Sequence, residues 1–177
     1  GGAMYGEARG LPTKETTPAH PTTPYGIAKY TIEQYLEVYA NEYGLRSAIL
    51  RYANVYGPRQ DPEGEAGVIS IFCDRIQRGE PMTIFGDGKQ TRDYVYVSDV
   101  VQANLIAMQR SLLGPVNIGT GMQTSVLRLT ELLKKVSGKR TRVQRRAGIE
   151  AEVRKSALDA KLAKRVLGWK PTVSLLD

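Results

Sequence analysis

Apolar residues recur at the three- and four-residue spacing of an amphipathic helix in five stretches of the chain. Side chains suited to helix N-caps precede three of these stretches: Thr23, Ser98 and either Thr124 or Ser125. Glycines suited to helix ends follow four of them. We therefore predict helices over residues 24–43, 67–78, 99–110, 125–137 and 158–167.

Shorter apolar runs between these helices predict strands over residues 46–52, 82–85, 92–97, 115–119 and 141–144. We interpret residues 1–6 as the exit of a buried strand, residues 7–22 as a surface loop, and residues 53–60 as a loop of turn formers. Strands that alternate with helices are typical of an α/β fold with a parallel sheet. Ligands bind at the carboxyl ends of such strands, so the loop after residue 52 is expected to contact one.

The first predicted helix carries a tyrosine and a lysine four residues apart, Tyr25 and Lys29, which share one face. Ile32 and Leu36 continue this stripe, so we expect that face to point inward. A phenol is a weak base at its ordinary pKa of about 10. An ammonium group one turn away favours the phenolate, which could then accept a proton from a sugar hydroxyl. A solvated lysine beside a packed tyrosine is the simpler alternative for such a pair.

Composition excludes several classes of protein. The 177 residues suffice for one domain with a core, and 41% hydrophobic and 24% charged residues are ordinary for a globular protein. One cysteine, Cys73, excludes a disulfide framework and fits the reducing cytoplasm. One histidine, His20, argues against a histidine-based metal site, so we expect no metal. No apolar run approaches the length of a membrane span, so we expect no membrane partner.

The net charge of +7 comes from 25 basic and 18 acidic residues, with much of the excess between residues 134 and 165. Nucleic-acid binding is one interpretation of such an excess. Aromatic residues are not interleaved in this region and no nucleic-acid motif occurs, so we expect no nucleic-acid partner. A solvated basic face, or arginines that bind a diphosphate, fits the pattern better.

Seven motifs occur in an order that resembles the NAD-dependent sugar-nucleotide epimerase/dehydratase family of the extended short-chain dehydrogenase/reductases. They are residues 2–6 (GAMYG), 24–29 (PYGIAK), 50–58 (LRYANVYGP), 84–88 (IFGDG), 92–100 (RDYVYVSDV), 117–121 (NIGTG) and 167–171 (LGWKP). Each motif is weak by itself, but their order covers essentially the whole chain. The family's Gly-rich dinucleotide fingerprint is absent, and Gly1 has no hydroxyl where a Ser or Thr is expected at or just before it.

The resemblance implies an α/β chain: late strands and helices of a Rossmann sheet plus a smaller α+β substrate-binding domain. We expect the 177 residues to be the C-terminal part of one unit, with residues 1–66 mainly Rossmann and residues 67–177 mainly substrate-binding, including returns to the sheet. The implied partners are NAD, a UDP-sugar and a second copy of the chain, paired through the Tyr25 helix. The implied reaction interconverts UDP-glucose and UDP-galactose by transient hydride transfer at C4.

The resemblance also assigns roles by position. It implies Tyr25 as acid/base, Lys29 as its partner and a nicotinamide-ribose ligand, and Tyr52 as part of the nicotinamide pocket. The implied substrate-binding residues are Asn54, Thr83, Ile84, Phe85, Arg92, Tyr94 and Arg146. Arg154 competes with Arg146 for the second diphosphate contact, because a short extra run separates residue 148 from residues 152–154. For most of these residues, packing in a strand, a turn or a salt bridge is the alternative.

Two other functions remain open at the level of sequence. One is another reaction of the same family, carried out by a dehydratase, a decarboxylase or a reductase. The other is a non-catalytic NAD-binding regulatory protein, against which the intact pair of Tyr25 and Lys29 argues, since a scaffold needs neither.

Overall fold

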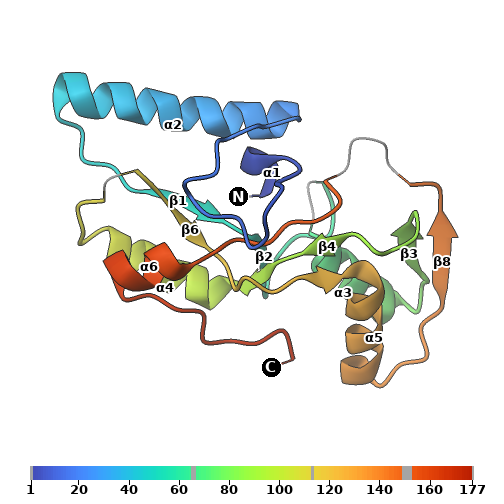
Figure 1. Ribbon diagram of the computed structural model, residues 1–177. Helices are drawn as coiled ribbons and strands as arrows, with labels where there is room; N and C mark the ends of the chain where they lie inside the picture. Colours follow the sequence, from blue (N-terminus) through green and yellow to red (C-terminus); the bar gives the residue numbers. More distant parts are fainter. Residues whose placement is uncertain (1, 65–66, 113, 149–152, 177) are drawn as a thin grey trace.

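The computed structural model describes residues 2–64, 67–112, 114–148 and 153–176. Its helices are α1 (Gly2–Tyr5), α2 (Pro24–Tyr43), α3 (Val68–Arg78), α4 (Val97–Ala107), α5 (Val126–Ser137) and α6 (Lys161–Leu167) (Figure 1). Its strands are β1 (Ile49–Tyr52), β2 (Asn54–Tyr56), β3 (Met82–Phe85), β4 (Thr91–Arg92), β5 (Tyr94–Tyr96), β6 (Pro115–Ile118), β7 (Thr124–Ser125) and β8 (Val143–Arg146). No helix in these ranges is long and apolar enough to cross a membrane.

One layer of the fold is built on the parallel pair β1–β6. Figure 1 shows α1 and α2 on one side of this pair and α4 and α6 on the other. A core fills the space on the α4–α6 side, where β6 contributes Val116 and Ile118. Parallel strands covered by helices confirm the predicted α/β class.

A second core lies between β3, α3 and α5. Phe72, Met82, Ile84 and Leu129 are almost completely buried in it. β3 pairs with β8 in parallel rather than with the strand that follows it in sequence. This second group of elements lies on the opposite side of the molecule from α2 (Figure 1).

Asp93 connects segments that are far apart in sequence. Its buried carboxylate accepts hydrogen bonds from the backbone N–H groups of Thr120, Gly121 and Leu158 at 3.0 to 3.2 Å. It lies between β4 and β5, so it ties these strands to the turn after β6 and to the approach to α6. Without these donors a buried carboxylate would be costly, so the position requires an acceptor.

The structure confirms most of the predicted helices. α2 begins where Thr23 accepts a hydrogen bond from the Gly26 N–H and ends at Gly44 in the left-handed conformation. α3 ends at Gly79, and Ser125 rather than Thr124 caps α5. α6 begins at Lys161, slightly later than predicted, because the Asp159 side chain accepts from the Lys161 N–H.

Other expectations were wrong. Residues 2–5 form the helical turn α1, because this turn places Met4 and Tyr5 against Leu158. Residues 54–56 are a strand, since they pair with β5 despite their turn-forming composition. Ser98 does not cap α4, which begins at Val97 directly after β5.

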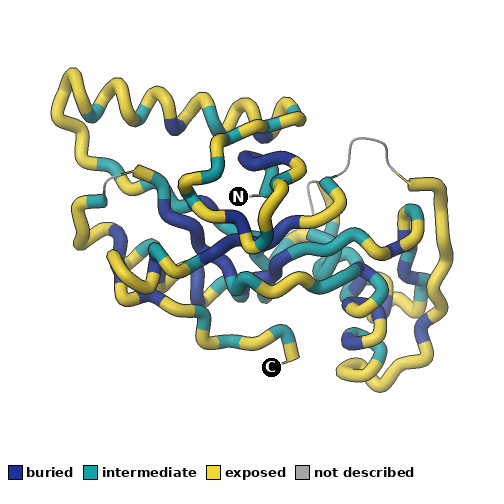
Figure 2. The backbone as a smooth tube through the Cα atoms, viewed as in Figure 1, coloured by how far each residue is buried: buried dark blue, intermediate teal, exposed yellow. Residues whose placement is uncertain are grey.

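The largest correction concerns the inner face of α2. Most of its expected stripe is exposed: Tyr25 is 54% exposed and Ile32 is 51% exposed, whereas Leu36 is half-buried. Only Gly26 and Glu33 of this helix are buried. Figure 2 shows exposed residues along most of α2. An open hollow of about 1870 Å³ borders this face of the helix.

Candidate active site on α2 and β1

The hollow beside α2 brings several of the predicted site residues together. Tyr25 and Lys29 border it from the helix, while Tyr52, Asn54 and Tyr94 border it from the strands. Tyr52 ends β1 and Asn54 follows it directly, at the carboxyl end of a strand, where open α/β sheets bind ligands. Tyr94 pairs with Asn54 from the neighbouring strand β5. The wall of the hollow is therefore a candidate site for a ligand.

Tyr25 and Lys29 form a pair that the helix itself holds. The Lys29 Nζ lies 5.4 Å from the centroid of the Tyr25 ring. The cap at Thr23 fixes the first turn, because its side chain accepts the Gly26 N–H at 3.1 Å. Both side chains are exposed, so a bound molecule can reach the Tyr25 phenol and the Lys29 ammonium group together.

Tyr52 and Asn54 differ in how firmly they are held. The Tyr52 hydroxyl donates to the Asn104 side chain at 2.9 Å, and its half-buried ring packs against the core under β1. Asn54 is exposed at the start of β2, where its backbone N–H donates to the Asp93 carbonyl at 2.8 Å. Asn54 thus presents its side chain from a fixed backbone, whereas Tyr52 also serves the packing of α4.

Three other predicted residues share one face of the β3–β8 pair. Phe85 pairs with Arg146 in register, and Thr83 accepts a hydrogen bond from Gln144 on the neighbouring strand at 2.7 Å. Phe85 is 39% exposed and Arg146 is exposed, so an aromatic ring and a guanidinium lie together at the surface. Ile84 points the other way and is completely buried in the second core.

Arg92 and Tyr94 do not form one continuous strand, because Asp93 separates β4 from β5. Arg92 is half-buried and donates from Nη1 to the Thr91 carbonyl at 3.0 Å. Tyr94 is 6% exposed and packs with Ile84, although its residue also borders the hollow. Tyr94 therefore connects the second core with the site beside α2, whereas Arg92 does not line the hollow.

Arg154 is already engaged in the structure. Its guanidinium pairs with the Asp87 carboxylate at 3.0 Å. Hydrogen bonds from the Lys89 backbone and from Arg154 lower the pKa of Asp87 below its ordinary value. Residues 149–152, which include the start of the candidate motif before Arg154, lie outside the described residues.

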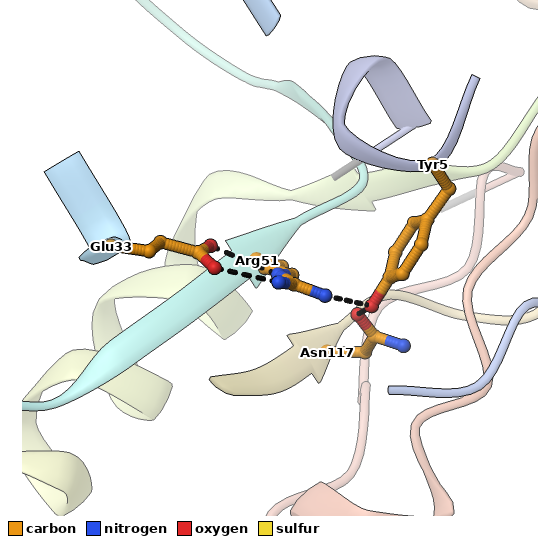
Figure 3. Close-up of polar contacts among 4 residues, drawn as sticks. All are labelled: Tyr5, Glu33, Arg51 and Asn117. Carbon is orange, nitrogen blue, oxygen red and sulfur yellow. Dashed lines mark hydrogen bonds and ion pairs between the residues drawn. The ribbon is translucent and has the colours of Figure 1, made fainter. Parts of the chain in front are cut away.

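A buried polar network beneath α2 was missed by the sequence analysis (Figure 3). Arg51 donates from Nε and Nη2 to the two carboxylate oxygens of Glu33, at 2.9 and 2.6 Å, and from Nη1 to the Tyr5 hydroxyl at 2.7 Å. Tyr5 in turn donates to the Asn117 side chain at 2.9 Å. The available signal was an arginine inside an apolar strand, a residue type that is rarely buried unless paired.

Burial and pairing perturb this network in different ways. Burial raises the pKa of Tyr5, although the hydrogen bond from Arg51 opposes the effect. Burial lowers the pKa of Arg51, but hydrogen bonds to Glu33 and Tyr5 outweigh it and raise the pKa overall. Arg51 therefore stays charged inside the fold.

The family model described as the NAD dependent epimerase/dehydratase family matches residues 1–119. With this match over more than half of its length, the chain belongs to that family, whose cofactor is NAD.

Individual relatives cover the chain almost completely. It is 42% identical over its whole length to the UDP-glucose 4-epimerase of Mycolicibacterium smegmatis, of which it covers 57%. Among solved structures, it is 55% identical to UDP-glucose 4-epimerase from Thermotoga maritima with UDP-glucose, with a TM-score of 0.97, covering 99% of this chain and 57% of that one. It is 33% identical to UDP-glucuronic acid 4-epimerase from Bacillus cereus in complex with UDP-glucuronic acid and NAD, with a TM-score of 0.90, covering 99% of this chain and 55% of that one. The chain thus spans somewhat more than half the length of these relatives.

The residues beside the hollow fit one end of NAD. Lys29 supplies a donor for ribose hydroxyls and Tyr25 supplies an aromatic hydroxyl on an open, accessible wall. The pyrophosphate end is different, because it needs a Gly-rich turn into a helix, and the sequence contains no G-x-G-x-x-G. The fit is therefore to the nicotinamide and ribose end alone.

Proposed function

We propose that the protein is an NAD-dependent nucleotide-sugar 4-epimerase that interconverts UDP-glucose and UDP-galactose. The observation that carries this proposal is the pair of Tyr25 and Lys29 on the wall of an open hollow at the carboxyl end of β1. The names of its relatives in this family support the substrate class. When bound, NAD supplies the acceptor and donor of a hydride at C4 of the sugar.

In this proposal Tyr25 takes the proton of the sugar hydroxyl and later returns it. The ammonium group of Lys29 lies beside the Tyr25 ring, on the same wall of the hollow. Lys29 also binds the ribose next to the nicotinamide, and Tyr52 closes the pocket behind it. Asn54 is placed to donate from its amide to the diphosphate of the substrate.

The nucleotide part of the substrate is assigned to the β3–β8 pair and to Arg92, none of whose residues lines the hollow itself. Phe85, with Thr83 and Ile84, packs the base; only the first two lie on the exposed face, so Ile84 acts through the backbone or the core. Arg92, beside Tyr94, binds the diphosphate with its fork of donors. Arg146 is favoured over Arg154 as the second arginine, because Arg154 is paired with Asp87.

We also propose how the chain is divided, how it assembles and where it acts. Residues 1–66 mainly form the Rossmann part, and residues 67–177 mainly form the substrate-binding part. The outer face of α2 exposes Ile27, Tyr35 and Val38, which suits a homodimer through this helix in the cytoplasm.

Replacement of the proposed acid/base tests the assignment. In the full-length protein, Tyr25→Phe should lower kcat by about 10²–10⁴. Affinity for UDP-glucose, measured by calorimetry, should change little. Tyr43→Phe is the matched control, because Tyr43 lies at the other end of the same helix and is 76% exposed. A Tyr25→Phe kcat within threefold of the parent would overturn the proposal.

A further inference from the structure

We propose that Glu33 and Arg51 act as a positioning pair, which sets where α2 presents Tyr25 and Lys29 over the end of β1. This inference rests on the proposed function, and neither residue touches the reacting atoms. Figure 3 shows the pair crossing from α2 to β1, with Tyr5 and Asn117 behind it.

Among the residues that the structure describes, few contacts other than this pair attach α2 to the rest of the fold. Of its 20 residues only Gly26 and Glu33 are buried. A helix is usually held by an apolar stripe, but here Ile32 is half exposed and the hollow lies beside it. Tyr30 packs against the cluster of Met4 and Tyr5 near the start of the helix, and beyond it the polar contact of Glu33 is the buried attachment of α2.

The contact between Glu33 and Arg51 is bidentate. Two N–H groups of Arg51 meet the two oxygens of Glu33 at 2.9 and 2.6 Å, so the fork of one side chain is matched to the fork of the other. Such bidentate pairs restrict direction as well as distance. Both side chains are nearly buried, and the third guanidinium nitrogen of Arg51 donates to the Tyr5 hydroxyl. Water therefore has little room to replace either partner.

Glu33 and Arg51 also lie close to the proposed site residues. Glu33 is one helical turn from Lys29 and two turns from Tyr25, on the same side of α2. A slip of α2 by one residue would turn these side chains by about 100°, away from the hollow. Arg51 immediately precedes Tyr52 and lies just before Asn54. The pair of Glu33 and Arg51 therefore fixes the position of α2 relative to the strand end that carries the other site residues.

A second anchor acts at the start of the helix. A Cβ on Gly26 would lie 2.5 Å from the Ala3 carbonyl oxygen, so α2 and α1 are in close contact there. Tyr5, at the end of the same short helix, is the residue that bonds Arg51. Lys29 thus lies between the close contact at Gly26 and the ion pair of Glu33, and Tyr25 directly precedes Gly26.

Two substitutions at one position separate placement from stability. Glu33→Asp keeps the charge but shortens the reach by one methylene, whereas Glu33→Gln keeps the reach and loses the charge. In the full-length protein, well below its Tm, we expect Glu33→Asp to lower kcat by about 10- to 100-fold with UDP affinity within twofold. We expect Glu33→Gln to have the lower Tm but the higher kcat of the two. Glu42→Asp and Glu42→Gln, at an exposed position of α2, are the matched controls.

A crystal structure of the Glu33→Asp protein gives a readout that does not depend on turnover. It should show α2 displaced along or about its axis relative to Asn54, with α4 and α6 in place. If kcat follows Tm in both variants, or if α2 does not move, the pair is merely structural and the inference is wrong. Tyr25→Phe in the same assay separates the two proposals: activity retained there refutes the proposed function, whereas activity lost there but kept in Glu33→Asp refutes only the positioning role.

Discussion

Tyr5 is the residue at which burial and hydrogen bonding can be measured together. It is 3% exposed, accepts from Arg51 and donates to Asn117. In Tyr5→Phe, an N–H of Arg51 and an oxygen of Asn117 remain buried without their partner. We expect a loss of about 1–3 kcal/mol in the free energy of unfolding near pH 8, measured by urea denaturation. Tyr43→Phe, at an exposed position, should be nearly neutral.

The same residue gives a pH dependence with a definite sign. Burial raises the folded-state pKa of Tyr5 above the unfolded value of about 10. The stability that Tyr5 contributes is therefore fully present below pH about 10 and is lost as the pH rises from there through the raised pKa. The difference in unfolding free energy between the parent and Tyr5→Phe should shrink above pH 10. A gap that grows with pH would contradict this assignment.

Arg92 is the site residue whose role is most open to a binding measurement. A desolvated guanidinium that clamps a diphosphate is worth about 2–5 kcal/mol in binding. In the full-length protein, Arg92→Ala should therefore weaken UDP by that amount in calorimetry, with the Tm little changed. Arg128→Ala is the control, because Arg128 is exposed on α5 and pairs with Glu131. Unchanged UDP affinity with a lower Tm would make Arg92 a structural residue.

At the scale of elements, Gly26 sets how closely α2 approaches α1. Alanine normally favours a helix interior over glycine by about 1 kcal/mol. Here an added Cβ would meet the Ala3 carbonyl at 2.5 Å, so the sign should reverse and Gly26→Ala should cost about 1–3 kcal/mol. Gly10→Ala meets nothing within 4 Å and should be tolerated. Thermal unfolding of the two variants measures the contrast, and a Gly26→Ala protein as stable as its parent would show that α2 can shift.

The elements also show how far sequence reasoning reaches. The bounds of α2 were predictable because Thr23, Pro24 and Gly44 act locally on the chain. The pairing of β3 with β8 was not, because these strands are about sixty residues apart and β8 is exposed at every position, without an alternating pattern. Register between such strands depends on the packing of whole segments.

The candidate site divides in the same way. The pair of Tyr25 and Lys29 follows from helical spacing alone, so a sequence motif suffices to find it. The link between Glu33 and Arg51 needs the crossing of α2 over β1, which no local pattern encodes. Ile84 shows the converse, because alternation along β3 turns it into the core while its neighbours face out.

At the scale of the molecule, α2 has two exposed sides, for which we propose different roles. One side faces the hollow with Tyr25 and Lys29. The other carries Ile27, Tyr35 and Val38, each at least half exposed. Apolar surface of this extent favours association, so a dimer through the outer face would leave the hollow free for ligands.

The last prediction concerns cofactor binding by the 177 residues alone. They supply the wall with Tyr25 and Lys29, but the sequence has no glycine-rich turn to hold the pyrophosphate, and β1 has a described partner only on the β6 side. An open strand edge and an exposed helix also favour association over ligand binding. We therefore expect no saturable NAD⁺ binding and no epimerase activity when this segment is expressed by itself. Titration with NAD⁺ by calorimetry, with the full-length protein as the positive control, measures this directly. Saturable binding at micromolar affinity would mean that the pyrophosphate is held by residues of this segment, with the basic stretch between Lys134 and Arg146 as the first place to look.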